Sequence, residues 1–181
     1  MNLANKITLF RVLLIPFFMI TLFSNFDNSA YIAALIFAVA SATDGIDGYI
    51  ARSRNQITTL GKFIDPLADK LLVSTALISM VELGKIPAWI VIIIIAREFT
   101  ITGFRIIAAS NGINIAASSL GKIKTITQLV AIISLLIDNY PFRSINFPFD
   151  IITLYLSLIF TIISGIDYIF KNRNVLKINK I

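Results

Sequence analysis

The chain has 181 residues, of which 57% are hydrophobic and only 14% charged, and its formal net charge is +6. Soluble globular domains are usually about one quarter charged, so this composition argues against a water-soluble fold. The sequence contains no cysteine and no histidine. Their absence excludes a disulfide framework, a thiolate metal site and most zinc chemistry, so acid–base or metal chemistry must fall to carboxylates.

Six apolar segments follow one another along the chain, each close to the ~20 residues that an α-helix needs to cross a membrane. They cover residues 7–24, 31–52, 61–83, 86–109, 120–138 and 150–170. Turn-forming residues separate the segments, and no linker divides the chain. No cleavage site follows the first segment, so we expect it to be a retained helix and not a signal peptide. The sequence therefore predicts an all-α fold, in which residues 1–181 form one integral membrane domain of six transmembrane helices.

Basic residues are distributed unevenly between the two sides of this predicted bundle. The side with the N-terminus, the 52–62 connection, the 97–124 region and the C-terminal tail carries 14 of the 16 Lys and Arg residues, all but Lys85 and Arg143. Because basic residues accumulate in cytoplasmic segments, both termini are predicted to be cytoplasmic, as an even number of spans requires. This topology explains most of the positive charge, so we expect no nucleic-acid partner.

Four aspartates lie at the cytoplasmic ends of the second and third predicted helices. Asp44 and Asp47 are three positions apart, and Asp65 and Asp69 are four apart, so each pair shares one face of its helix. The short connection between the helices makes them antiparallel neighbours whose faces can meet. Four carboxylates in one place repel each other unless cations lie between them, and oxygen ligands without His or Cys indicate Mg²⁺ or Mn²⁺. The alternative is a set of structural ion pairs with nearby basic residues, which are Arg52, Lys62 and Lys70.

These residues resemble the signature of the CDP-alcohol phosphotransferase family, Asp-x-x-Asp-Gly-x-x-Ala-Arg followed by Gly-x-x-x-Asp-x-x-x-Asp. Every fixed position of the signature is present: Asp44, Asp47, Gly48, Ala51, Arg52, Gly61, Asp65 and Asp69. Gly45 stands at a variable position where bacterial relatives more often carry a bulky aromatic residue. We expect this difference to change local packing and not the chemistry.

The resemblance implies that a CDP-linked lipid donates its phosphatidyl group to an alcohol and releases CMP. It also implies a homodimer in the cell membrane with its active site on the cytoplasmic side. The residue roles that it implies are Asp44, Asp47 and Asp65 as metal ligands, Asp69 as a further ligand or as the catalytic base, and Gly48, Arg52 and Gly61 beside the nucleotide of CDP-diacylglycerol. The glycines could instead serve only to bring the helices close together.

Four cations lie on the same side of the membrane as the aspartates and could hold a second, anionic substrate. They are Arg97 and Arg105 in the fourth segment and Lys122 and Lys124 at the start of the fifth. The sequence blocks around them are similar to the phosphatidylglycerophosphate synthase branch of the family, which implies sn-glycerol 3-phosphate as the acceptor. The alternative is that these side chains reach toward the membrane interface without binding a substrate.

The N-terminal stretch also resembles this branch, which usually has proline where Ala4 stands. Asn5, Thr8 and Arg11 would then lie near the nucleotide or phosphate pocket. Their alternative role is to start the first helix and anchor it at the interface. Ala4 affects only the geometry at which that helix begins.

Two other functions remain open from the sequence. A transferase of the same family could use another acceptor. Serine is disfavoured, because it would leave the four cations without an anion. Inositol phosphate also carries a dianion, and only the sequence blocks similar to the phosphatidylglycerophosphate synthase branch argue against it. A divalent-cation transporter would use the aspartates as ion ligands. Such a transporter should have polar groups near both membrane faces, and residues 12–40 and 71–95 offer few near the outer one.

Overall fold

The computed structural model describes residues 3–53, 59–110, 112–113, 115 and 118–173, with side chains described for all of these except 3–5, 44–53, 59–66 and 110. Within this part of the chain there are six α-helices and one short 3-10 helix, and no strand. They are α1 (Leu3–Leu22), α2 (Ser29–Ser53), α3 (Thr59–Glu82), α4 (Ala88–Ser110), α5 (Ser119–Leu136), η1 (Phe142–Ile145) and α6 (Phe149–Lys171). The all-α prediction is confirmed, and each helix coincides with a predicted segment to within a few residues.

Local sequence signals explain where several helices begin and end. Gly84 follows α3 with φ +68, a left-handed conformation that glycine adopts at little cost. Pro87 comes directly before α4, where its fixed φ favours the start of a helix. Ser118 caps α5, because its side-chain oxygen accepts a hydrogen bond from the backbone N–H of Gly121 at 3.1 Å,.

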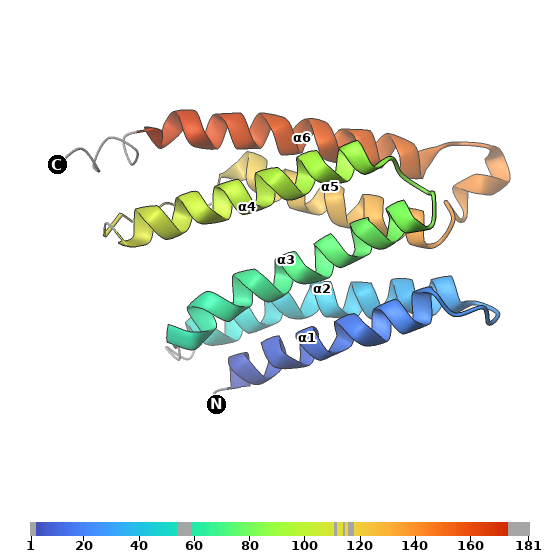
Figure 1. The fold of residues 1–181 in the computed structure, drawn as a ribbon, viewed down its shortest axis with the longest axis horizontal. Helices are drawn as coiled ribbons and strands as arrows, with labels where there is room; N and C mark the ends of the chain where they lie inside the picture. The colour runs from blue at the N-terminus through green and yellow to red at the C-terminus, as the bar shows by residue number, and fades with distance from the viewer. Residues whose placement is uncertain (1–2, 54–58, 111, 114, 116–117, 174–181) are drawn as a thin grey trace.

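The helices run alternately up and down, so the helix ends that carry the aspartates and the predicted phosphate-binding cations lie at the same end of the bundle. The connections from α1 to α2, from α3 to α4 and from α5 to α6 lie at one end (right in Figure 1). The start of α1, the end of α6 and the connections from α2 to α3 and from α4 to α5 lie at the other end (left in Figure 1). This arrangement brings together the end of α2, the start of α3, the end of α4 and the start of α5.

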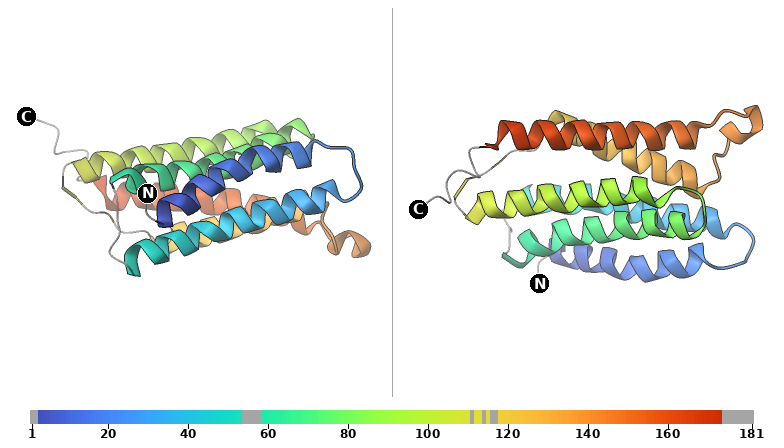
Figure 2. Two further views of the ribbon diagram at one scale, coloured as in Figure 1. Left: turned by 90° about the horizontal axis from the view of Figure 1, so that it is seen from below. Right: turned by 45° about the horizontal axis from the view of Figure 1, so that its top comes forward.

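The bundle consists of two groups of three helices, α1 to α3 and α4 to α6, which Figure 2 shows from two further directions. In the first group α1 packs against α2 and α3, and in the second α6 packs against α4 and α5. Helix α3 lies centrally and contacts both α4 and α5, and α2 also contacts α5. Side chains of both groups form one apolar core, whose largest fully buried members include Phe18, Phe37, Leu72, Leu77, Met80, Ile90, Ile94, Ile132, Leu136 and Leu154.

The outer surface of the bundle is apolar as well. Largely exposed hydrophobic side chains occur on almost every helix, including Leu13, Phe17, Ile20, Leu35, Ile92, Ile126 and Phe170. Monomeric water-soluble proteins rarely expose extensive apolar surface of this kind. Among the described helices, α5 and α6 are long and apolar enough to cross a membrane, and residues 29–43 of α2 form a shorter apolar stretch. Helices α3 and α4 carry several charged residues near the end where the aspartates lie.

Candidate functional site

The aspartate motif lies on two helices that pack against each other at one end of the bundle. Asp44 and Asp47 fall in the last part of α2, and Asp65 and Asp69 fall in the first part of α3. The side chain of Asp69 is described, is partly buried and has at least one interaction partner. The other predicted residues of this motif have side chains outside the described part of the chain, as does Asn5; they are Asp44, Asp47, Gly48, Arg52, Gly61 and Asp65.

A buried arginine fixes the helix that carries the first two aspartates. The side chain of Arg11 in α1 is fully buried. Its Nε donates hydrogen bonds to the carbonyl oxygen of Ala40 at 3.1 Å and to Oγ1 of Thr43 at 3.3 Å. Thr8, one turn earlier on α1, is also buried. A charged group in an apolar interior is stable only when it is hydrogen-bonded, so Arg11 constrains α1 and α2 just before Asp44.

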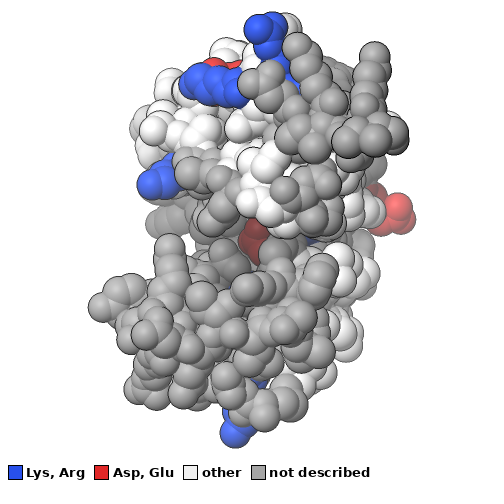
Figure 3. Space-filling view, turned by 90° about the vertical axis from the view of Figure 1, so that its left-hand side faces the viewer, with Lys and Arg blue, Asp and Glu red and all other residues white. Residues whose placement is uncertain are grey.

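A cavity of about 500 Å³ lies between α3, α4 and α5, with Tyr168 of α6 on its wall. Asp69 and all four predicted phosphate-binding cations line it, namely Arg97, Arg105, Lys122 and Lys124. Figure 3 looks onto this end of the molecule and shows an acidic side chain at the bottom of a hollow near the centre of the face. The structure therefore brings the predicted base and the predicted cations to one cavity.

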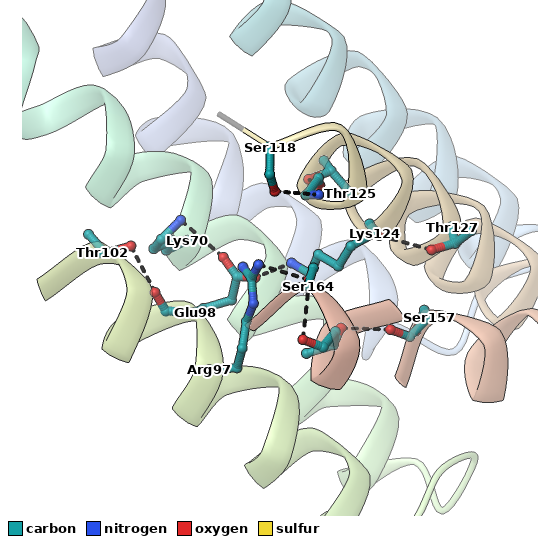
Figure 4. A network of polar contacts seen from close by, with 12 residues as sticks. Lys70, Arg97, Glu98, Thr102, Ser118, Lys124, Thr125, Thr127, Ser157 and Ser164 are labelled. Carbon is teal, nitrogen blue, oxygen red and sulfur yellow. Dashed lines mark hydrogen bonds and ion pairs between the residues drawn. The ribbon is translucent and has the colours of Figure 1, made fainter. Parts of the chain in front are cut away.

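A compact ion cluster forms one wall of this cavity, with the carboxylate of Glu98 at its centre. Lys70 Nζ of α3 lies 3.1 Å from Glu98 Oε2, and Arg97 NH1 of α4 lies 3.2 Å from Glu98 Oε1. Lys124 Nζ of α5 also donates to Glu98 Oε1. Figure 4 shows these three cations converging on Glu98 from three helices. Lys124 is buried in this cluster and does not extend to the membrane interface.

The side chain of Arg97 lies against α6. Its NH2 donates to Oγ of Ser164 at 2.9 Å, while its Nε is buried without a hydrogen-bond partner. Gly165 makes room for this arrangement, since a Cβ at that position would lie 3.0 Å from Cγ of Arg97. A buried N–H without a partner is costly, so the Nε of Arg97 is an unsatisfied donor where the side chain packs against Gly165.

The two remaining cations differ in their surroundings. Arg105 Nε donates to the hydroxyl of Tyr168 at 3.0 Å, and the guanidinium lies 5.3 Å from the centre of the tyrosine ring. This contact holds Arg105 at the cavity wall through both a hydrogen bond and a cation–π interaction. Lys122 is exposed, because residues two positions apart on a helix face opposite directions and Lys124 takes the buried face.

Sequence reasoning missed several residues of the cavity. Lys70 enters the sequence analysis only as a possible ion-pair partner of the aspartates, and Glu98 is not predicted to belong to the site. A carboxylate within an apolar helix was the available signal for Glu98, since such charges are rare and usually functional. Ser164 and Tyr168 had no sequence signal. The amide Nε2 of Gln128, which also lines the cavity, is buried and has no hydrogen-bond partner.

Comparison with known proteins identifies the family. The family model described as CDP-alcohol phosphatidyltransferase matches residues 1–163. The chain belongs to this family. The matched region contains Asp69 and every cation predicted to bind phosphate.

Several similar proteins from different bacteria carry the same name. A CDP-diacylglycerol–glycerol-3-phosphate 3-phosphatidyltransferase of Bacillus subtilis is 48% identical over 97% of this chain and 97% of its own length. A protein of the same name from Haemophilus influenzae is 41% identical over 93% of this chain and 91% of its own length. Another, from Wigglesworthia glossinidia brevipalpis, is 37% identical over 94% of this chain and 94% of its own length. These matches confirm the resemblance inferred from the aspartate signature.

The contact between Gly165 and Arg97 predicts a position-specific effect of a single methyl group. Gly165→Ala should push the Arg97 side chain away from Ser164 and lower stability by ~1–3 kcal/mol, the usual cost of overpacking. Gly103→Ala is the matched control, because a Cβ there has no neighbour within 4 Å and alanine favours a helix. Thermal unfolding of the purified variants measures the difference. Equal midpoints for the two variants would contradict the tight contact.

Proposed function

We propose that this chain is a membrane enzyme that transfers a phosphatidyl group from CDP-diacylglycerol to sn-glycerol 3-phosphate, giving phosphatidylglycerophosphate and CMP. The observation that carries the proposal is the cavity that Asp69 lines together with cations contributed by α4 and α5. A carboxylate beside an anion-binding wall suits the deprotonation of a hydroxyl on a phosphorylated alcohol. The names of the similar proteins specify the same donor and acceptor.

We further propose that residues 1–181 form one integral membrane domain that crosses the bilayer six times. The α-helices have 18 to 25 residues, close to the ~20 needed to cross hydrocarbon, and their outward side chains are largely apolar. The end with the aspartates and most of the basic residues would face the cytoplasm, together with both termini. A CDP-linked lipid could then enter sideways, and the water-soluble acceptor could enter from the cytoplasm. The family resemblance also favours a homodimer in the plasma membrane.

Asp44, Asp47 and Asp65 would hold Mg²⁺ or Mn²⁺, and Asp69 would be a further ligand or the base. The donor set fits such an ion, because it consists of hard carboxylate oxygens on two helices that pack together,. When bound, the divalent cation neutralises the charge that develops on the CMP leaving group. Gly48, Arg52 and Gly61 would border the nucleotide, and Asn5 and Thr8 would lie nearby at the start of α1.

Asp69 would act as the base that accepts the proton of the attacking hydroxyl. It lines the cavity that also contains the cations, so a bound acceptor could reach both. General-base catalysis requires the base to lie within hydrogen-bonding distance of the hydroxyl. Holding the acceptor at one end by its phosphate would orient the hydroxyl at its other end toward Asp69.

The phosphate of glycerol 3-phosphate would bind to the four cations of the cavity, Arg97, Arg105, Lys122 and Lys124. All four line the cavity, and hydrogen bonds between such cations and a phosphate are charge-assisted and strong. A neutral acceptor such as serine would leave these cations without a matching anion. Inositol phosphate would satisfy them, so acceptor selectivity must also depend on the remaining cavity wall.

The proposed metal site predicts a strict dependence on divalent cations. EDTA should abolish CMP release, and added Mg²⁺ or Mn²⁺ should restore it. Asp44→Asn, Asp47→Asn and Asp65→Asn should each lower the rate at least ~100-fold, because charge stabilisation in the transition state is lost. Asp27→Asn is a matched control, since Asp27 is exposed in the turn before α2. Full turnover in EDTA would exclude the metal site.

The cation wall predicts a selective effect on the acceptor. Arg97→Ala and Arg105→Ala should each raise the KM for glycerol 3-phosphate about 10- to 150-fold, the equivalent of ~1.5–3 kcal/mol for a charge-assisted hydrogen bond. The KM for CDP-diacylglycerol should stay nearly constant. Replacement by lysine should restore only part of the loss, because an ammonium group lacks the planar arrangement of the guanidinium.

Arg143→Ala provides the control for this experiment, because Arg143 is exposed at the opposite end of the bundle. It should leave both KM values unchanged. A parallel rise in the KM of donor and acceptor in the Arg97 and Arg105 variants would mean that these residues do not hold the acceptor selectively.

A further inference from the structure

Glu98 is an acidic residue at the centre of a site that should bind an anion. Both of its carboxylate oxygens are occupied by cations, Oε2 by Lys70 and Oε1 by Arg97 and Lys124. Its side chain is only 12% exposed, so these contacts are shielded from water. A carboxylate in this place would repel a phosphate if it were free, and its function therefore depends on its partners.

The three partners come from three different helices, α3, α4 and α5 (Figure 4). Without an anion between them, Lys70, Arg97 and Lys124 would repel one another strongly, because charges interact more strongly in a poorly hydrated interior than in water. With Glu98 between them the cluster has three cations and one anion. Its net charge of +2 matches a phosphate dianion in magnitude and opposes it in sign.

The contacts with Glu98 leave other donors of the cations free for a ligand. An ammonium group has three N–H donors, and the Nε of Arg97 is buried without a partner. The second nitrogen of Arg97, NH2, is fixed by Ser164. The carboxylate thus holds the cations in one arrangement, while Lys70 and Lys124, which line the cavity, each keep ammonium donors that Glu98 does not use.

We propose that Glu98 is a positioning residue that gathers Lys70, Arg97 and Lys124 into a preformed binding site for the acceptor phosphate. This inference rests on the proposed function and adds two residues to it, Glu98 and Lys70. A preformed site binds more tightly, because the ordering of its side chains does not have to be completed when the ligand arrives. Glu98 itself does not contact the phosphate.

Glu98→Gln tests the inference, because it keeps the size of the side chain and removes its charge. The cations would then repel one another, and the KM for glycerol 3-phosphate should rise tenfold or more, while the KM for CDP-diacylglycerol should change less than twofold. Glu98→Asp keeps the charge, so its KM for glycerol 3-phosphate should be closer to that of the unaltered enzyme. The chain offers a matched control in its other glutamate, Glu82, which is exposed near the end of α3; Glu82→Gln should change neither KM.

Lys70→Met provides a second variant in case Glu98→Gln does not fold. It removes one cation and leaves Glu98 bound to Arg97 and Lys124, so it should raise the same KM by a smaller factor and again spare the donor. In the double variant the two effects should be less than additive, because both substitutions disrupt one cluster.

The outcomes separate this inference from the proposed function. Unaltered enzyme that releases no CMP with glycerol 3-phosphate contradicts the proposed function. If the unaltered enzyme is active, an unchanged or lowered acceptor KM in Glu98→Gln, or in Lys70→Met if the former does not fold, overturns only the role of Glu98. An equal rise in both KM values overturns it as well, because a general loss of structure does not discriminate between two substrates.

Discussion

Charge buried at one end of an apolar bundle is the constraint on which the rest of this structure depends. An ionised side chain away from water is stable only when it is paired or hydrogen-bonded. Glu98, Lys70, Arg97 and Lys124 satisfy this requirement together, and Arg11 satisfies it through the backbone and side chain of α2. The ion cluster around Glu98 and the hydrogen bonds of Arg11 both connect different helices, so these polar contacts also fix how the helices pack.

The division of the bundle into a polar end and an apolar remainder follows from the same constraint. The buried interior consists of aliphatic and aromatic side chains with several buried serines and threonines, whereas the cavity between α3, α4 and α5 carries acidic and basic side chains. The substrates named for the similar proteins combine a lipid with a water-soluble phosphate ester. A bundle with one polar end can bring these two kinds of molecule together at the boundary between membrane and water.

The sequence predicted the helices well, because hydrophobic length and turn residues act locally. It also predicted that Asp69, Arg97, Arg105 and Lys124 would lie on one side, since helix direction alternates along the chain. It could not predict that Glu98 would lie among three cations, or that the side chain of Arg97 would pack against Gly165. These contacts join distant residues, and the hydrogen bond from Arg97 to Ser164 spans 67 positions. They depend on how deeply and at what angle the helices pack.

The pair Lys122 and Lys124 shows the same limit within a single helix. Both were predicted to bind phosphate on the basis of charge and side of the membrane. Helical geometry places them on opposite faces, so that Lys124 is buried beside Glu98 while Lys122 is exposed. Which of two neighbouring lysines turns inward depends on the rotation of α5 about its axis, and packing against α6, α2 and α3 determines that rotation.

The most direct test is to measure CMP release by the purified protein from CDP-diacylglycerol with one acceptor at a time. Glycerol 3-phosphate, glycerol, serine and inositol phosphate form a suitable panel, because they differ in charge and in shape. We expect rapid release with glycerol 3-phosphate and very slow release with glycerol, since only the former has the dianion that the cation wall would bind. Faster release with serine or inositol phosphate than with glycerol 3-phosphate would contradict the proposed acceptor.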